Sequence, residues 1–158
     1  MKKFTFYLKI CAYAILCIGF LSFSFPDPLE EDAGYVQQQL SAHCNTAPGT
    51  LQIKKYELNV TKTGFCRYKR FLQNGKVEYF SFNLIKFKHM DYLGNTQSGI
   101  LYLRTKGDDV IVQTYNDSKG GDIDSMSTYM SIPLKSIEPE DLNEFAQRFQ
   151  RMSLALRR

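Results

Sequence analysis

The feature that most constrains the fold is a change in hydrophobic period close to the C-terminus. From Thr50 to Pro133 the chain is rich in β-branched and aromatic residues and is divided by short turn sequences, a pattern typical of β-strands. From Leu142 to Leu156 the apolar residues recur three or four positions apart, which predicts an amphipathic helix. Parallel strands need crossover connections of about a dozen residues, and the links here are shorter, so we expect antiparallel neighbours.

Turn sequences set the expected strand boundaries. Asn74-Gly75 is typical of a tight hairpin, and Gly107-Asp108-Asp109 predicts a second one. The apolar alternation changes face at Lys54-Lys55, which indicates a bulge, and the polar, glycine-rich stretch 116–124 is expected to be a loop. The expected strands are 50–60, 65–72, 77–84, 85–93, 100–106, 110–115 and 126–134.

Both expected helices have start signals. Asp27 can cap a helix whose first residue is Pro28, and Pro139 is followed by two acidic residues at the start of the C-terminal helix. The fold class predicted is α+β: a mostly antiparallel six- or seven-stranded sheet or small barrel, capped by the C-terminal amphipathic helix, with a short N-terminal helix after the signal segment. One face of that N-terminal helix is apolar: Leu29, Ala33, Val36, Leu40 and Cys44.

The first residues are typical of an export signal. Lys2 and Lys3 are followed by an uncharged, largely apolar run from Ile10 to Phe25. We expect residues 1–24 to be a signal peptide, or an uncleaved N-terminal anchor, because the run is intermediate in length between signal and membrane-spanning segments. Residues 25–158 are then a single globular domain outside the cytoplasm, periplasmic or secreted, or held at the membrane if the segment is retained.

The charge balance argues against a nucleic-acid partner. The net charge is +4, but Lys2, Lys3 and Lys9 belong to the signal, and without them it falls to +1. Nucleic-acid-binding domains are usually strongly basic, so we expect no nucleic acid. The region from Lys54 to Lys106 is nonetheless rich in lysine and arginine, which indicates either solvated strand faces or a patch for an anionic surface.

The cysteines predict a disulfide. Cys11 and Cys17 belong to the signal, and Cys44 and Cys66 remain as a pair in an exported domain. The alternative is two buried free thiols. No CxxC motif is present, which argues against a thioredoxin-like redox site.

The search for a catalytic or metal site gives weak candidates. His43 and His89 lack metal-ligand spacing, and we expect both to be structural. Three aspartates close to Gly120-Gly121 could bind calcium, although a polar loop tip explains them equally well. These aspartates are Asp117, Asp122 and Asp124. We predict no resident metal and no cofactor.

A pair of glutamates and a set of tyrosines are further candidates for a functional site. Glu57 and Glu78 could form a pair of catalytic carboxylates if the fold brings them together. The many aromatic residues are expected to fill the core, but an exposed patch for sugar or peptide could form among the lysines. Its expected members are Tyr56, Tyr68 and Tyr79.

The strand series from Leu51 to Leu134, closed by the helix from Pro139 to Leu156, resembles the pleckstrin-homology-like superfold. The stretch Phe80-Ser81-Phe82-Asn83-Leu84 is similar to a segment of uncharacterised exported bacterial proteins of this shape. The resemblance is architectural, covers most of the mature chain, and implies a binding scaffold rather than an enzyme. True family members bind lipid headgroups through basic residues of the first hairpin, but no defined headgroup motif can be matched here. The basic residues in that region are Lys54, Lys55, Lys62, Arg67, Lys69 and Arg70.

We therefore expect a non-enzymatic exported binding or scaffold domain of the bacterial cell envelope, whose partner is an unknown envelope protein or ligand. One alternative is a small extracytoplasmic hydrolase with a site assembled from residues distant in sequence. Another is binding to an anionic surface or lipid headgroup through the basic strands. Contact with the membrane is otherwise expected only through the N-terminal segment, if that is uncleaved.

Overall fold

The computed structural model describes residues 27–158, and the predicted signal segment, 1–24, lies outside the described residues. The fold class is α+β, as predicted, and every strand pair is antiparallel. The elements in chain order are α2 (Pro28–His43), β1 (Ile53–Val60), β2 (Phe65–Leu72), β3 (Val77–Asn83), η1 (Leu84–Lys86), β4 (Phe87–Gly94), β5 (Ser98–Thr105), β6 (Val110–Tyr115), β7 (Ile123–Ser127), β8 (Tyr129–Lys135) and α3 (Pro139–Leu156).

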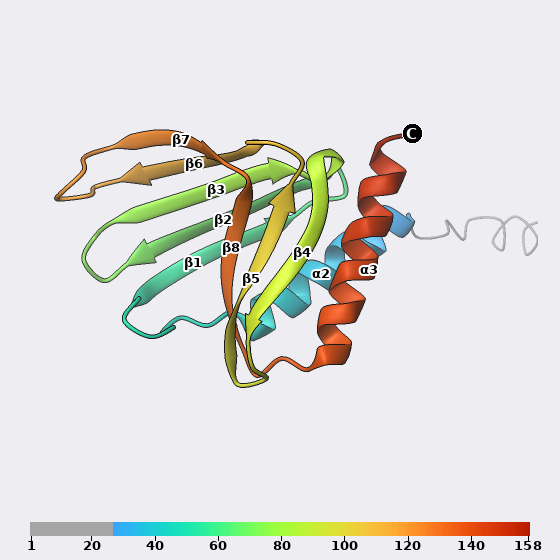
Figure 1. The fold of residues 1–158 in the computed structure, drawn as a ribbon, viewed down its shortest axis with the longest axis horizontal. Coiled ribbons are helices and arrows are strands. Elements are labelled where there is room, and N and C mark those ends of the chain that lie inside the picture. The colour runs from blue at the N-terminus through green and yellow to red at the C-terminus, as the bar shows by residue number, and fades with distance from the viewer. Residues whose placement is uncertain (1–26) are drawn as a thin grey trace, which may run out of the picture.

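The strands of residues 27–158, eight where the sequence predicts six or seven, form two antiparallel sheets. The five-stranded sheet has the order β1-β2-β3-β6-β7, and the three-stranded sheet has the order β4-β5-β8. In Figure 1 the strands of the two sheets run in clearly different directions, and the five-stranded sheet extends well past the three-stranded one. Both helices lie at the opposite end from this extension.

The chain first changes sheet at η1. The Asn83 side chain accepts a hydrogen bond from the Ile85 N–H at 2.9 Å, which starts the short 3-10 helix between β3 and β4. The sequence is consistent with the expected strand 85–93 being a bent continuation of strand 77–84, but this turn places Phe87–Gly94 in the other sheet. A side-chain cap and three residues are enough to redirect the chain.

The second change of sheet corrects the hairpin predicted across Gly107-Asp108-Asp109: β5 belongs to the three-stranded sheet and β6 to the five-stranded sheet, so the two strands do not pair.

The third change of sheet, from β7 to β8, corrects two further expectations. The single last strand expected at 126–134 is divided at Thr128, whose carbonyl accepts from the Thr105 N–H at 2.9 Å. The loop expected at 116–124 ends earlier, because Ile123 already belongs to β7 and pairs with Thr114. Its turn is closed by the Asp122 side chain, which accepts from the Asn116 N–H at 2.9 Å, while Asn116 adopts a φ of 56°.

The first three strands follow the sequence prediction closely. The pairing register of β1 shifts between Ile53 and Lys55, which confirms the predicted bulge. The Asn74-Gly75 turn closes the β2–β3 hairpin through the bond from the Leu72 N–H to the Lys76 carbonyl at 2.8 Å. Gly75 has a φ of 88°, a conformation that favours glycine.

Both helices begin as predicted and turn their apolar faces to the core. The Asp27 side chain accepts from the Leu29 N–H at 3.0 Å at the start of α2. At the start of α3 the Asp141 side chain accepts from the Glu138 N–H at 3.3 Å. The buried helix residues include Val36, Leu40, Phe145, Phe149 and Met152. None of the helices within 27–158 is long and apolar enough to cross a membrane.

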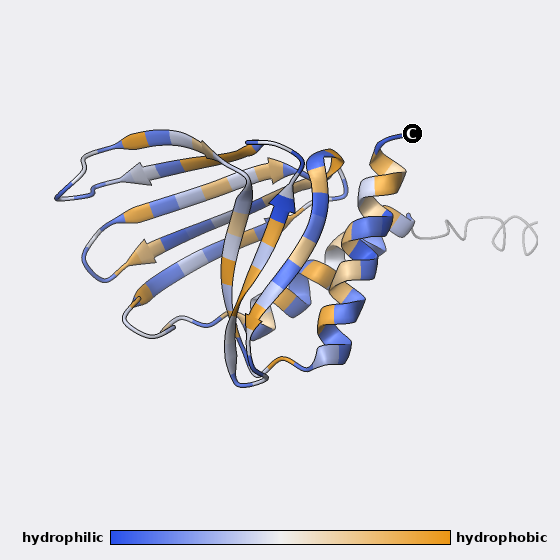
Figure 2. Ribbon diagram, viewed as in Figure 1, coloured by the Kyte–Doolittle hydropathy of each residue, from blue (hydrophilic) through white to orange (hydrophobic). Residues whose placement is uncertain are grey.

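One hydrophobic core joins both sheets and both helices. It includes Cys66 and Tyr68 of β2, Leu101 and Leu103 of β5, and Phe149 of α3. Figure 2 shows hydrophobic and hydrophilic residues alternating along the strands of the five-stranded sheet. That alternation divides the sheet into a buried inner face and an outer face, and the outer face is the first candidate for function.

Candidate functional site

The outer face of the five-stranded sheet is the candidate site, and the pairing register defines it. Each row of paired residues points to one side of the sheet, and the rows through Arg67, Lys69 and Phe71 lie on the side opposite the buried Cys66 and Tyr68. The term outer face denotes the following residues here: Lys55, Glu57, Asn59, Phe65, Arg67, Lys69, Phe71, Val77, Tyr79, Ser81, Ile111, Gln113, Tyr115, Asp124 and Met126.

Cations on the outer face lie over aromatic rings. The Arg67 guanidinium is 4.6 Å from the centre of the Phe65 ring, and the Lys69 ammonium is 5.0 Å from the centre of the Phe71 ring. Lys55 approaches the same Phe71 ring at 5.3 Å. Such cation–π contacts contribute about 0.5–1 kcal/mol at exposed sites and hold the charged groups at the surface of the sheet.

Two of these cations have no carboxylate partner. Lys55 forms an ion pair with Glu57 at 2.7 Å. Within residues 27–158, no carboxylate lies within ion-pair distance of Arg67 or Lys69. They lie two residues apart on β2, about 7 Å along the strand. Lys69 lies across from Glu57 and, after Lys55, helps to lower the pKa of that carboxyl, but neither Lys69 nor Arg67 is engaged in an ion pair with any of the described residues.

Exposed apolar side chains lie in the same rows as these cations. Ile111 is 45% exposed and Met126 is 55% exposed, and both belong to the row that contains Arg67. Phe65, under the Arg67 guanidinium, is 38% exposed. The outer face therefore combines free positive charge with apolar surface.

The aromatic patch predicted from Tyr56, Tyr68 and Tyr79 does not form. Tyr68 is fully buried, and the Tyr56 hydroxyl donates to the Ser41 carbonyl of α2 at 2.9 Å. Of the three, only Tyr79 belongs to the outer face. The aromatic residues that meet the cations are Phe65 and Phe71, which could be found from their alternation with Arg67 and Lys69 in the sequence.

The basic strands do not form one continuous patch either. Arg70 points to the inner face, where its Nε donates to the Glu78 carboxylate at 2.5 Å. Lys76 bridges Glu78 at 3.1 Å and Asp117 at 3.0 Å. Burial raises the pKa of the Glu78 carboxyl, but the charges of Arg70 and Lys76 lower it more, and the net shift is downward. This chain of ion pairs keeps Glu78 ionised.

The predicted pair of carboxylates is separated by the sheet. Glu57 is paired with Lys69 on the outer face, whereas Glu78 is paired with Arg70 on the inner face. The two groups therefore cannot flank the same bond of a substrate. Each also has its own cation, Lys55 for Glu57 and Arg70 for Glu78.

The three aspartates proposed for calcium are committed to other partners. Asp117 accepts from the Lys119 N–H at 2.9 Å and pairs with Lys76, and Asp124 accepts from Gln113 at 3.1 Å. Asp122 closes the turn at Asn116. In the part of the chain that the structure describes, no group of three or more His, Cys, Asp or Glu residues could hold a metal ion.

The two cysteines are free thiols in the structure, unlike the predicted disulfide. Cys44 follows α2 and forms an isolated bridge with Leu134, whereas Cys66 pairs with Val60 and Phe82 inside the five-stranded sheet. Burial raises the pKa of Cys44 to about 11 and that of Cys66 to about 12. Both behave as small apolar core residues, which is the alternative that the sequence left open.

The histidines contact single partners. Nδ1 of His43 lies 3.2 Å from the Lys135 carbonyl, and Nε2 of His89 lies 3.6 Å from the Asp91 carboxylate. Asp91 also accepts from Arg104, whose guanidinium is 5.7 Å from the centres of the Tyr102 and Tyr129 rings. These contacts hold the outer side of the three-stranded sheet together.

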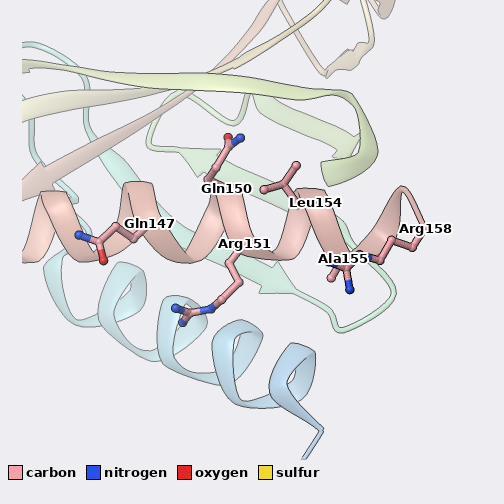
Figure 3. A pocket seen from close by; sticks show the side chains of 6 residues that line it. All are labelled: Gln147, Gln150, Arg151, Leu154, Ala155 and Arg158. Carbon is pink, nitrogen blue, oxygen red and sulfur yellow. The ribbon is translucent and has the colours of Figure 1, made fainter.

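A second surface feature is a groove along α3. One hollow of about 470 Å³ is lined by α3 residues that include Gln150 and Leu154, and by Arg158 just after the helix. A second hollow, of about 370 Å³, lies between Ala146 and Gln150 of α3 and the start of β4, and the two share Gln147 and Gln150. Figure 3 shows Gln150 and Leu154 pointing away from α2, while Arg151 points toward it.

Comparison with known proteins adds no relative: no family model, no curated protein and no solved structure matches this chain. The resemblance to the pleckstrin-homology-like superfold therefore stays a prediction.

Proposed function

We propose that this chain is a non-enzymatic binding domain that works outside the cytoplasm and docks on an anionic membrane surface through the outer face. The observation that carries the proposal is the pair of cations without carboxylate partners, Arg67 and Lys69, each over a phenylalanine ring. Arginine and lysine without internal partners are free to contact phosphate groups.

The apolar residues of the outer face favour a lipid surface over a soluble polyanion. A polyanion in water would pair with Arg67 and Lys69 but would leave Ile111 and Met126 in water. A lipid interface accepts both kinds of group, because headgroups bind the cations while the acyl boundary receives apolar side chains. Interleaved cations and exposed apolar residues thus fit anionic lipid best.

The expected affinity is modest. Each lysine or arginine close to an anionic membrane contributes about 1 kcal/mol, so Arg67 and Lys69 together supply about 2 kcal/mol. The exposed apolar residues add to this. The N-terminal segment, if retained, would keep the domain close to the membrane, and the outer face would then determine how it lies on the lipid.

Sedimentation with lipid vesicles tests the proposal. The exported protein is mixed with vesicles of phosphatidylcholine, with or without phosphatidylglycerol, at low and high salt. We expect stronger partition into the vesicles that contain phosphatidylglycerol, weakened by salt because the interaction is screened. R67Q/K69Q should lower the partition coefficient roughly thirtyfold, the equivalent of about 2 kcal/mol.

A matched control removes the same charge elsewhere. Lys106 and Lys135 are exposed residues beside the three-stranded sheet, and neither belongs to the outer face. K106Q/K135Q should partition like the wild type. Equal losses in the two double variants, or tighter binding to soluble polyglutamate than to the anionic vesicles, would overturn the proposal.

A further inference from the structure

We propose that the groove between β4 and α3 binds an extended, acidic segment of a partner protein, which adds as a strand to the free edge of β4. This site is separate from the outer face. It lies on the side of the fold where the three-stranded sheet meets the C-terminal helix (Figure 3). Three features of the groove support such an occupant: the open edge of β4, the shape of the groove and its positive charge.

The edge of β4 is partly open. Within 27–158, β4 pairs with β5 on one side, and no strand pairs with its other side. Arg157 covers the beginning of that free edge, since it donates to the carbonyls of Ile85 at 3.0 Å and Phe87 at 2.7 Å. No side chain of the described residues caps the backbone from Lys88 to Met90.

The edge of β1 shows how this fold covers a strand edge. The Gln37 side chain donates to the Leu58 carbonyl at 2.7 Å and accepts from the Val60 N–H at 2.8 Å. This amide takes the place of a neighbouring strand, which blunts an edge that could otherwise pair with another chain. The backbone beside the groove has no such cover, so those of its donors and acceptors that face away from β5 remain free for a peptide.

The side chains of α3 that line the groove are suited to contact with the backbone of an extended peptide. Ala146 is small, and Gln147 and Gln150 present amides that can donate and accept hydrogen bonds. Further along α3, Leu154 is 51% exposed and offers an apolar contact. Small, amide and apolar side chains in this order allow a peptide to lie flat between the helix and the strand.

The charge of the groove selects an acidic occupant. Among the residues that line the two hollows none is Asp or Glu, whereas Lys88, Arg151 and Arg158 are cationic. Arg151 is held by Asp32, but Lys88 has no carboxylate within ion-pair distance in the described chain. A segment that carries alternate acidic residues would place its carboxylates beside the free cations.

The length of the groove matches a short strand. From Ala146 to Leu156, its last residue, α3 rises about 15 Å, at about 1.5 Å per residue. An extended segment covers that distance with about four or five residues, at about 3.3 Å per residue. A partner helix has no free backbone groups to pair with the β4 edge, which is why an extended segment is preferred.

Selection from a displayed library of random peptides of about eight residues, with the exported protein as bait, tests this inference. We expect acidic peptides with alternating apolar residues to be enriched. Bound peptide should slow hydrogen exchange at the backbone amides of Lys88, His89 or Met90, because a new strand protects an edge. Failure to enrich any peptide, or protection confined to β2 and β3, would overturn the inference.

Two variants of the protein test whether the selected peptides bind in the groove. A146F fills the groove, and its control N143F places the same side chain at an exposed position of α3 outside the groove. We expect A146F to weaken binding about tenfold or more and N143F to leave it unchanged. If A146F fails to fold by circular dichroism, K88E serves instead, because it reverses a rim charge on an exposed side chain. Unchanged binding in folded A146F or in K88E contradicts the inference.

The two proposals fail separately. A146F and K88E should bind anionic vesicles like the wild type, and R67Q/K69Q should bind the selected peptides like the wild type. Loss of peptide binding in R67Q/K69Q would show that the peptides bind to the outer face, and would contradict the proposal that they bind in the groove.

Discussion

Asp32 of α2 accepts two hydrogen bonds from the Arg151 guanidinium of α3, at 2.6 Å from Nε and 2.5 Å from Nη2. Arg148 donates to the same carboxylate at 2.8 Å and lies 3.9 Å from the centre of the Tyr35 ring. Asp32 is only 3% exposed, so the contact that joins the two helices is a carboxylate almost removed from water. Such a group is tolerated because both oxygens have cationic partners.

The first prediction concerns that carboxylate. D32N keeps the shape of the side chain but removes the charge that balances Arg148 and Arg151. We expect the free energy of unfolding to fall by about 3 kcal/mol, the lower end of the range for breaking buried ion pairs, because Arg151 is itself half-exposed. Urea unfolding measures the change, and D124N, at an exposed position, should have little effect.

The second prediction is the pH dependence of the same contact. The hydrogen bonds from Arg151 are the largest cause that lowers the pKa of Asp32, and burial opposes them only in part. A carboxyl whose pKa is lower in the folded state stabilises the fold above its unfolded pKa, about 3.9, and loses this contribution as the pH falls through the folded value. The stability difference between wild type and D32N should therefore be constant from neutral pH to about pH 5 and shrink below about pH 4. A difference that stays constant at low pH would contradict the assignment.

The third prediction concerns the covered edge of β1. Q37A removes both hydrogen bonds that the amide makes to Leu58 and Val60. We expect a loss of about 1–3 kcal/mol in unfolding free energy, together with faster aggregation, because a strand edge is left open. Q38A changes the exposed neighbour and is the matched control, measured by urea unfolding and light scattering.

The fourth prediction concerns the thiols. Cys44 and Cys66 are buried and their pKa values are raised, so both should react slowly with a thiol reagent in the native protein and rapidly after unfolding. Unfolding without a reductant should make the thiols of both Cys44 and Cys66 available for alkylation. A linked Cys44–Cys66 peptide in the mass spectrum of unreduced protein would instead support the disulfide expected from the sequence.

Local signals predicted the elements of this fold well. The helix starts at Asp27 and Pro139, the Asn74-Gly75 turn and the bulge at Lys54-Lys55 depend on neighbouring residues alone, and each is present. Strand β7 was missed because its residues, Ile123–Ser127, are mostly small or polar and are stabilised by pairing with β6. A segment of this kind has a low β-propensity of its own, because its strand conformation depends on pairing with another strand.

The outer face could be predicted only in part. Alternation along β2 places Arg67 and Lys69 on one side, but the sequence did not show that this side is the one away from the core. The burial of Asp32 could not be predicted for a similar reason, since an aspartate in an acidic first turn of a helix usually faces water. Its partners lie more than a hundred residues away along the chain.

The sequence by itself determined the fold class, the helix starts, the Asn74-Gly75 hairpin and the antiparallel pairing, because hydrophobic period, caps and turn residues act over a few positions. It did not determine the turn at Gly107-Asp108-Asp109, where the expected hairpin is a passage between sheets. Only the tertiary structure decided that the strands divide into two sheets, that Glu57 and Glu78 lie on opposite faces, and that a groove opens between β4 and α3. The physical reason is that these features depend on which distant surfaces pack together. Once the inner face of the five-stranded sheet is buried against the helices and the second sheet, Arg67 and Lys69 are left on the outside, over phenylalanine rings and with no carboxylate of the described residues within ion-pair distance.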